Sequence, residues 1–209
     1  MTEVWIERTQ YQAAIWQFIQ HHQDEAVFAF TDGSVCNGSV GCGACSAMLF
    51  TPGMSEPSIH TKSVGKLVNS VCCEMEGILL GTEVDIGSLI QRQAQKNQDT
   101  AYIMCDCKSA METVINMVQL RRYPVIVKRL QALIKQLQCI SVTVKLIYIH
   151  GHTGIPGNEL ADRKAREVAH DISVDKISAQ KEITIHEGYR MTVVMLLKSW
   201  QHKCNEDNT

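Results

Sequence analysis

Between residues 26 and 67, short apolar runs alternate with turns that contain glycine. The run at 26–34 ends in Asp-Gly-Ser, which predicts a strand that enters a turn at Asp32. A second strand is predicted over 44–50 and a more polar third strand over 59–67. Because the connections between these runs are short, we expect an antiparallel meander.

From residue 72 onward, the apolar positions recur with the helical period or form short buried runs. The pattern predicts helices and strands over these ranges: helices at 72–95, with an interruption near Gly87, and at 107–118, 124–138 and 158–169; strands at 101–105 and 142–150. Strands that alternate with helices in this order indicate an α/β domain with a mixed sheet.

The chain divides into three parts on this pattern. Residues 1–25 are predicted as an N-terminal helical extension, and 26–170 as the α/β domain. The C-terminal extension, 171–209, is predicted to be extended over 171–185 and to end in a helix at 187–203.

Composition narrows the class of protein. The 209 residues are 45% apolar and 20% charged, which is typical of a globular protein. No apolar run reaches the length of a membrane helix, and the first residues lack the apolar core of a signal peptide. We therefore expect an intracellular protein whose nine cysteines are reduced. Cys42 and Cys45 form a C-x-x-C without a second such pair, and their strand points them to opposite faces.

The net charge is −2, from 20 Lys and Arg against 22 Asp and Glu. Proteins that bind nucleic acid tightly on their own are usually basic. If this chain acts on nucleic acid, we expect weak binding, a local patch or a partner.

Four acids stand at the ends of predicted elements: Asp32, Glu74, Asp106 and Asp162. Each taken alone is better explained as a turn former, a helix cap or a solvated charge. If the strands of Asp32 and Asp106 are neighbours, however, the two carboxylates meet at one edge of the sheet. Clustered carboxylates repel, and a divalent cation with a preference for oxygen, Mg²⁺ or Mn²⁺, relieves that repulsion.

Four segments, in order, carry a resemblance to a known family: FTDGSVCNGSVGCGA, CEMEGILLG, IMCDCKSAM and HGHTGIPGNELADRKA. Together they resemble type 1 ribonuclease H, from Val27 to Ala169. The resemblance implies a ribonuclease H-like fold with a five-stranded mixed sheet, three antiparallel strands followed by two parallel additions, flanked by helices. It also implies a metal-dependent endonuclease that hydrolyses the RNA strand of RNA–DNA hybrids and leaves 5′-phosphate and 3′-hydroxyl ends.

The same resemblance implies roles for single residues. Asp32, Glu74, Asp106 and Asp162 match the carboxylates that hold two Mg²⁺ ions, for which Mn²⁺ substitutes. His152 matches a loop histidine that shuttles protons or helps the product to leave. The rivals are Glu76, which points to another helix face than Glu74, and His150, which we assign to the end of a strand. Substrate contacts are implied for these residues: Gly33, Ser34, Asn37, Ser109 and Asn158.

Departures from cellular members of the family favour one branch. Ser70 to Cys73 stand where cellular enzymes usually have polar amides, and with the His-Thr-Gly-Ile-Pro-Gly-Asn loop they resemble the ribonuclease H domain of non-LTR retrotransposon polyproteins. Only Arg121, Arg122, Lys128 and Arg129 stand near the place where many cellular enzymes have a basic helix and loop. We therefore expect a reverse transcriptase domain of the same polyprotein as a partner. From the apolar pattern we expect no association with a membrane.

Two alternatives belong to other classes. One is a catalytically weak binding module with a ribonuclease H fold, although a scaffold has no use for repelling carboxylates. The other is an enzyme of the same fold that acts on DNA, such as a resolvase or transposase.

Overall fold

A computed structural model describes residues 8–22, 26–36, 42–50, 57–66, 68–92, 99–116, 123–139 and 141–174. Its strands are β1 (Ala26–Cys36), β2 (Cys42–Phe50), β3 (Ser58–Lys66), β4 (Asp99–Cys105) and β5 (Val142–Tyr148). Its helices are α1 (Arg8–His22), α2 (Ser70–Arg92), α3 (Lys108–Asn116), α4 (Pro124–Cys139) and α5 (Pro156–Val174). The order of elements along the core is the one that the apolar pattern predicts.

The strands form one mixed sheet in the order β3-β2-β1-β4-β5. The first three strands are antiparallel neighbours, whereas β4 and β5 join with parallel pairing. This arrangement confirms the predicted five-stranded mixed sheet with two parallel additions.

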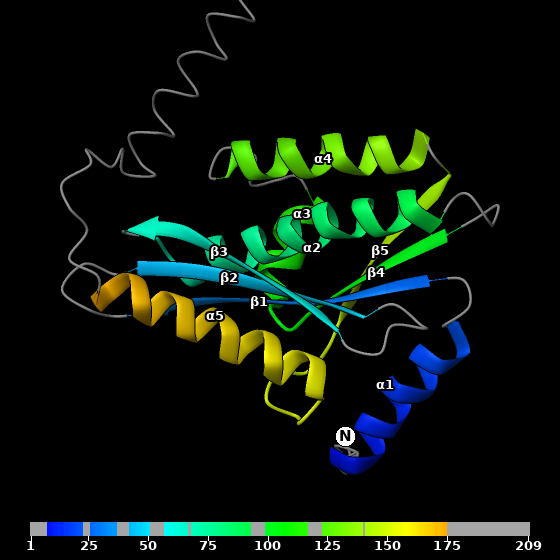
Figure 1. Ribbon diagram of the computed structural model, residues 1–209, viewed down its shortest axis with the longest axis horizontal. Helices are drawn as coiled ribbons and strands as arrows, with labels where there is room; N and C mark the ends of the chain where they lie inside the picture. The colour runs from blue at the N-terminus through cyan, green and yellow to red at the C-terminus, as the bar shows by residue number, and fades with distance from the viewer. Residues whose placement is uncertain are drawn as a thin grey trace, which may run out of the picture.

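Helices cover both faces of the sheet (Figure 1): α2, α3 and α4 lie on one side, and α1 and α5 on the other. The alternation along β1 explains how both faces bury apolar surface. Val27 and Ala29 belong to the core beneath α2 and α4, while Phe28 and Phe30 belong to the core beneath α1 and α5. A strand with such a continuous apolar run must be covered on both sides.

Two predicted details of the elements are wrong, and the first of them concerns a residue of the site. β1 does not end at Asp32, because its pairing with β2 continues to Cys36 opposite Cys42. Asp32 therefore lies within a strand. The interruption of α2 near Gly87 is also absent, since this helix continues to Arg92. A single glycine costs a helix only about 1 kcal/mol, which neighbouring contacts easily offset.

The extensions differ from their predictions in part. Residues 171–174 continue α5 and are helical rather than extended. Residues 175–209, with the predicted helix at 187–203, lie outside the described residues. α1 confirms the helical prediction over 8–22 and packs on the core, because Ile19 is 2% exposed. The domain boundaries at 25 and 170 stay predictions.

The described residues bear on two expectations from composition. None of the helices within them combines the length and apolarity needed to cross a membrane. Their cysteines are all free thiols, as predicted.

Candidate active site

The sheet brings Asp32 and Asp106 together. Parallel pairing of β1 with β4 stops at Thr31, which lies opposite Cys105. The next residue of the chain is an aspartate in both cases, so the two carboxylates lie side by side where the paired strands part. This confirms the geometry expected for these two acids, even though only β4 ends there.

Glu74 reaches this point from the first turns of α2. The helix begins beside Asn69, whose Oδ1 accepts a hydrogen bond from the Cys72 backbone N–H at 2.9 Å. A Cβ at Gly33 would overlap the backbone N of Glu74, so glycine lets the helix approach β1 closely. Glu74 is consequently 8% exposed and lies against Asp32.

Asp162 comes from α5 on the opposite face of the sheet. The Ser46 hydroxyl on β2 donates a hydrogen bond of 2.5 Å to the Ala161 carbonyl, which fixes this helix against the sheet. At Gly157 a Cβ would collide with the ring of Phe30, so the helix start also lies close to β1. Asp162 is 9% exposed and close enough to Asp32 for the two carboxyl groups to interact.

Burial and mutual repulsion dominate the electrostatics of the cluster. Desolvation, then the charges of Asp106 and Asp162, raise the pKa of Asp32 to about 7. Desolvation, then the charge of Asp32, raises the pKa of Glu74 to about 10. No ion pair in the described ranges joins either acid to a Lys or Arg. Asp32 and Glu74 therefore form a buried set of oxygen ligands whose negative charge is unfavourable without a cation.

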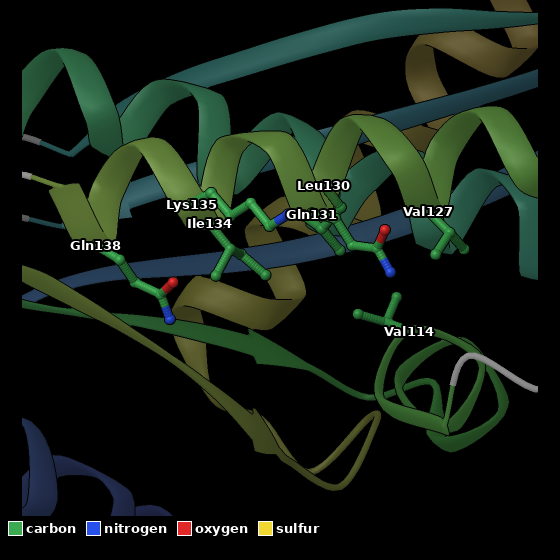
Figure 2. A pocket seen from close by; sticks show the side chains of 7 residues that line it. All are labelled: Val114, Val127, Leu130, Gln131, Ile134, Lys135 and Gln138. Atoms are coloured by element: carbon green, nitrogen blue, oxygen red, sulfur yellow. The ribbon is translucent and has the colours of Figure 1, made fainter. Parts of the chain in front are cut away.

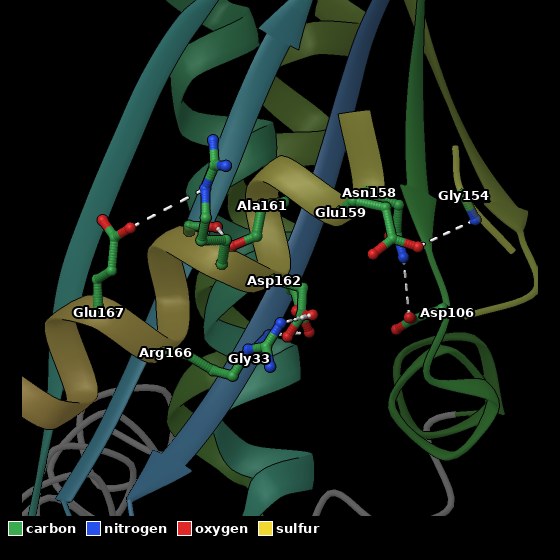
Figure 3. Close-up of polar contacts among 12 residues, drawn as sticks. Gly33, Asp106, Gly154, Asn158, Glu159, Ala161, Asp162, Arg166 and Glu167 are labelled. Carbon is green, nitrogen blue, oxygen red and sulfur yellow. Dashed lines mark hydrogen bonds and ion pairs between the residues drawn. The ribbon is translucent and has the colours of Figure 1, made fainter. Parts of the chain in front are cut away.

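The other two acids have polar partners (Figure 3). Arg166, one turn further along α5, pairs with Asp162. The side-chain amide of Asn158 donates a hydrogen bond of 3.0 Å to Oδ2 of Asp106. Asn158 is 3% exposed, and its own Oδ1 is buried with no hydrogen-bond partner among the described residues. A buried polar atom left in this way normally faces a ligand, an ion or water.

His152 lies in the loop between β5 and α5, residues 149–155, which we call the histidine loop. Its ring is exposed, and a ring nitrogen lies within 4.8 Å of carboxylate oxygens of Glu159 and Asp162. Its φ of 54° is in the left-handed region, which is uncommon for a residue other than glycine. The histidine thus borders the acidic cluster at its solvent side.

The two rivals lie elsewhere. Glu76 pairs with Lys62 of β3 at 2.6 Å, on the helix face away from Asp32. His150 follows β5, which ends at Tyr148 rather than at 150 as predicted, and its backbone N–H donates to the hydroxyl of Tyr11 at 3.0 Å. Both positions fit the preference for Glu74 and His152.

The predicted substrate contacts are only partly placed. Gly33 and Ser34 are half-buried at the rim of the cluster, Ser109 is exposed at the start of α3, and Asn158 is buried against Asp106. Asn37 lies outside the described residues. Sequence reasoning missed Arg166 and Glu159, although a four-residue spacing from Asp162 on a helix is a readable signal for Arg166.

The donor set fits a hard divalent cation. Asp32, Glu74, Asp106 and Asp162 offer only carboxylate oxygen, the ligand that Mg²⁺ and Mn²⁺ prefer. One sulfur lies nearby, since Cys105 Sγ is 3.9 Å from Oε2 of Glu74. Burial, then the charge of Glu74, raises the pKa of this thiol well above its usual value, so it stays protonated and is a poor ligand.

A separate cavity of about 390 Å³ lies between α3 and α4 (Figure 2). Apolar side chains such as Val114, Leu130 and Ile134 form much of its wall, with Gln131, Lys135 and Gln138 around them. None of the lining residues is a predicted site residue.

A model of the RNase H family matches residues 24–170. The chain therefore belongs to the RNase H family, and this membership supports a ribonuclease H activity that acts on nucleic acid. Among curated protein sequences, none matches the chain.

Solved structures show the same fold at low identity. The RNase H1 of the archaeon Halobacterium salinarum is 17% identical with a TM-score of 0.51, over 70% of this chain and 98% of its own. The N-terminal RNase H domain of Rv2228c from Mycobacterium tuberculosis is 18% identical with a TM-score of 0.52, over 74% and 99%. The protease–reverse transcriptase of prototype foamy virus is 13% identical with a TM-score of 0.50, over 72% of this chain and 21% of its own.

Proposed function

We propose that this protein is an endonuclease that hydrolyses the RNA strand of RNA–DNA hybrids and leaves 5′-phosphate and 3′-hydroxyl ends. One observation carries the proposal: four carboxylates from β1, α2, β4 and α5 converge on one point of an RNase H fold, two of them with strongly raised pKa values. A purely structural site would not collect repelling charges there.

Asp32, Glu74, Asp106 and Asp162 would hold a pair of Mg²⁺ ions, or Mn²⁺ in their place. Bound ions of this kind supply activation of a water and stabilisation of charge during an in-line phosphoryl displacement. The protein's own contribution is placement. The side-chain amide of Asn158 donates a hydrogen bond to Oδ2 of Asp106 and so fixes the orientation of that carboxylate. Arg166 balances the charge of Asp162.

His152 stands beside Asp162 and Glu159 and is exposed to solvent. An imidazole at this position can carry a proton between the reacting phosphate and solvent. We assign it that task, or the related task of helping the product leave. Gly33, Ser34, Asn37 and Ser109 are the residues that we expect to meet the hybrid, where contact with 2′-hydroxyl groups distinguishes RNA from DNA.

The test is cleavage of a labelled RNA–DNA hybrid beside an RNA duplex and a DNA duplex of the same sequence, each with Mg²⁺, Mn²⁺ or EDTA. We expect cleavage of the hybrid alone, with either metal, and none in EDTA. End-labelling of the products reads the 5′-phosphate and 3′-hydroxyl directly. Asp32→Asn should abolish cleavage, whereas Asp171→Asn, an exposed aspartate on α5, should not.

Other outcomes select the alternatives. Hybrid binding without metal-dependent cleavage favours the binding module. Cleavage of the DNA strand of a chimeric substrate favours a DNA-processing enzyme. Either result overturns the proposed activity.

We further propose that the protein works beside a reverse transcriptase domain of the same polyprotein. The foamy virus relative is a protease–reverse transcriptase chain, of which the present chain matches 21%. The net charge of −2 supports weak independent binding, and Arg129 is already paired with Glu83 at 2.5 Å. Weak hybrid affinity in a salt titration of the isolated protein supports this proposal, and nanomolar affinity at physiological salt contradicts it. The intracellular setting stays a prediction.

A further inference from the structure

Helix α1 lies outside the segment that the family model matches, yet it contacts the histidine loop directly. The side-chain amide of Gln12 donates hydrogen bonds to the carbonyl oxygens of Thr153 at 2.8 Å and Gly154 at 2.9 Å. The hydroxyl of Tyr11 accepts a hydrogen bond of 3.0 Å from the backbone N–H of His150. The helix thus binds the loop on both sides of His152.

The loop is a segment that needs support. His152 has a φ of 54° and Gly154 a φ of 79°. A residue other than glycine in the left-handed region costs on the order of 1 kcal/mol, and such a conformation persists only where surrounding contacts hold it. From the α5 side, Glu159 accepts a hydrogen bond of 3.0 Å from the Gly154 backbone N–H (Figure 3). The contacts of Gln12 and Tyr11 hold the same loop from the α1 side.

α1 is itself fixed to the sheet by its other end. Ile19 is 2% exposed, and the ring of Phe18 packs edge-on against Tyr102, with centroids 5.0 Å apart. Tyr11 and Gln12 stand about two turns before these anchors. The ring of Tyr11 also packs edge-on against His150 at 5.1 Å. Because the helix is anchored in the core, its hydrogen bonds impose a fixed position on the loop.

We propose that α1 is a positioning element for His152, with Gln12 and Tyr11 holding the histidine loop in the conformation from which His152 acts. This inference rests on the role proposed above for His152. The hydrogen bonds found for Gln12 and Tyr11 run to the backbone of the histidine loop, not to a carboxylate of the acidic cluster. Their loss should therefore lower kcat and leave KM unchanged, because substrate affinity comes from other residues.

The test compares Gln12→Glu with Gln17→Glu. The first keeps the shape of the side chain but replaces the donor with a carboxylate that faces two carbonyl oxygens. The second makes the same change of charge on an exposed position of the same helix. We expect Gln12→Glu to lower kcat for hybrid cleavage at least fivefold with KM unchanged, and Gln17→Glu to match the wild type. Equal kcat values for the two variants would overturn the proposal.

A second variant and a readout that does not depend on activity complete the test. Tyr11→Phe keeps the ring and removes the acceptor for the His150 N–H. Amide hydrogen exchange at His150 should then be about tenfold faster, with thermal unfolding unchanged; unchanged exchange would overturn the proposal.

If Gln12→Glu fails to fold, the kcat of Tyr11→Phe decides in its place. A kcat of Tyr11→Phe equal to that of the wild type would then overturn the proposal. A wild type that does not cleave hybrids would refute the proposed function and with it the role of the helix, whereas intact cleavage with unaffected variants refutes the helix role alone.

Discussion

The acidic cluster has two sides that are held in opposite ways. Asp32 and Glu74, the buried pair, are desolvated, and neighbouring carboxylates raise the pKa of both: Asp106 and Asp162 act on Asp32, and Asp32 acts on Glu74. Among the described residues, no Lys or Arg is paired with either acid. The α5 side comprises Asp162, Glu159 and His152. Its histidine is exposed, and each of its two acids has a donor: Arg166 pairs with Asp162, and the Gly154 N–H donates to Glu159. The buried pair carries repelling charge with no basic partner among the described residues, while each acid of the α5 side already has a donor.

The largest expected effect comes from the acid between the two sides. Asp106→Asn removes a carboxylate oxygen from the cluster while keeping its shape. We expect cleavage of the hybrid to fall at least about 1,000-fold, about 4 kcal/mol in the barrier. Circular dichroism and thermal unfolding should show an intact fold, because a repelling charge is lost. Collapse of the fold would contradict a catalytic assignment.

The α5 side should contribute less to the rate. For His152→Ala we expect kcat to fall about 100-fold, the lower end of the effect of a positioned acid or base. His60→Ala, on edge strand β3, is the matched control and should cleave like the wild type. Equal activity of both variants would remove His152 from the reaction.

The buried pair should make the protein without divalent ions less stable as pH rises. The folded state keeps the proton of Asp32 up to about pH 7, whereas the unfolded chain releases it near 3.8. Between these values the folded state binds more protons, so the free energy of unfolding falls as pH rises, on the order of 4 kcal/mol. Urea unfolding in EDTA from pH 4 to 8 measures this decline. Asp32→Asn should show a flatter profile, and an identical profile would contradict the raised pKa.

The smallest effect concerns Arg166. Because its guanidinium competes for the charge of Asp162, Arg166→Ala should strengthen Mg²⁺ binding about twofold, in line with the small energies of half-exposed ion pairs. Arg163→Ala is the control, since Arg163 is exposed and pairs with Glu167 instead. Calorimetric titration distinguishes the two variants. Weaker Mg²⁺ binding in Arg166→Ala would mean that the arginine orients Asp162 rather than competing for it.

Much of this site could be predicted from the sequence, because acids at element ends and the order of motifs are local signals. Asp32 shows the limit of that reasoning. Its Asp-Gly-Ser context resembles a turn, but pairing of β1 with β2 carries the strand on to Cys36. The pairing of distant strands overrides local turn chemistry here.

The contribution of α1 was not predictable for a related reason. Nothing near Tyr11 or Gln12 in the sequence marks them as partners of residues 150–154, which lie more than a hundred residues away. The same holds for Asn158, whose bond to Asp106 joins the start of α5 to the end of β4. Contacts of this kind follow from the fold and leave no local pattern.

The central claim is that burial and repulsion make Asp32 and its neighbours a divalent-cation site. The most direct measurement is thermal unfolding of the wild type and Asp32→Asn at pH 8, in EDTA and in saturating MgCl₂. We predict that the variant is the more stable protein in EDTA, and that Mg²⁺ raises the Tm of the wild type by several degrees and that of the variant by clearly less. Equal Mg²⁺ shifts in the two proteins, or a variant less stable than the wild type in EDTA, would contradict the claim.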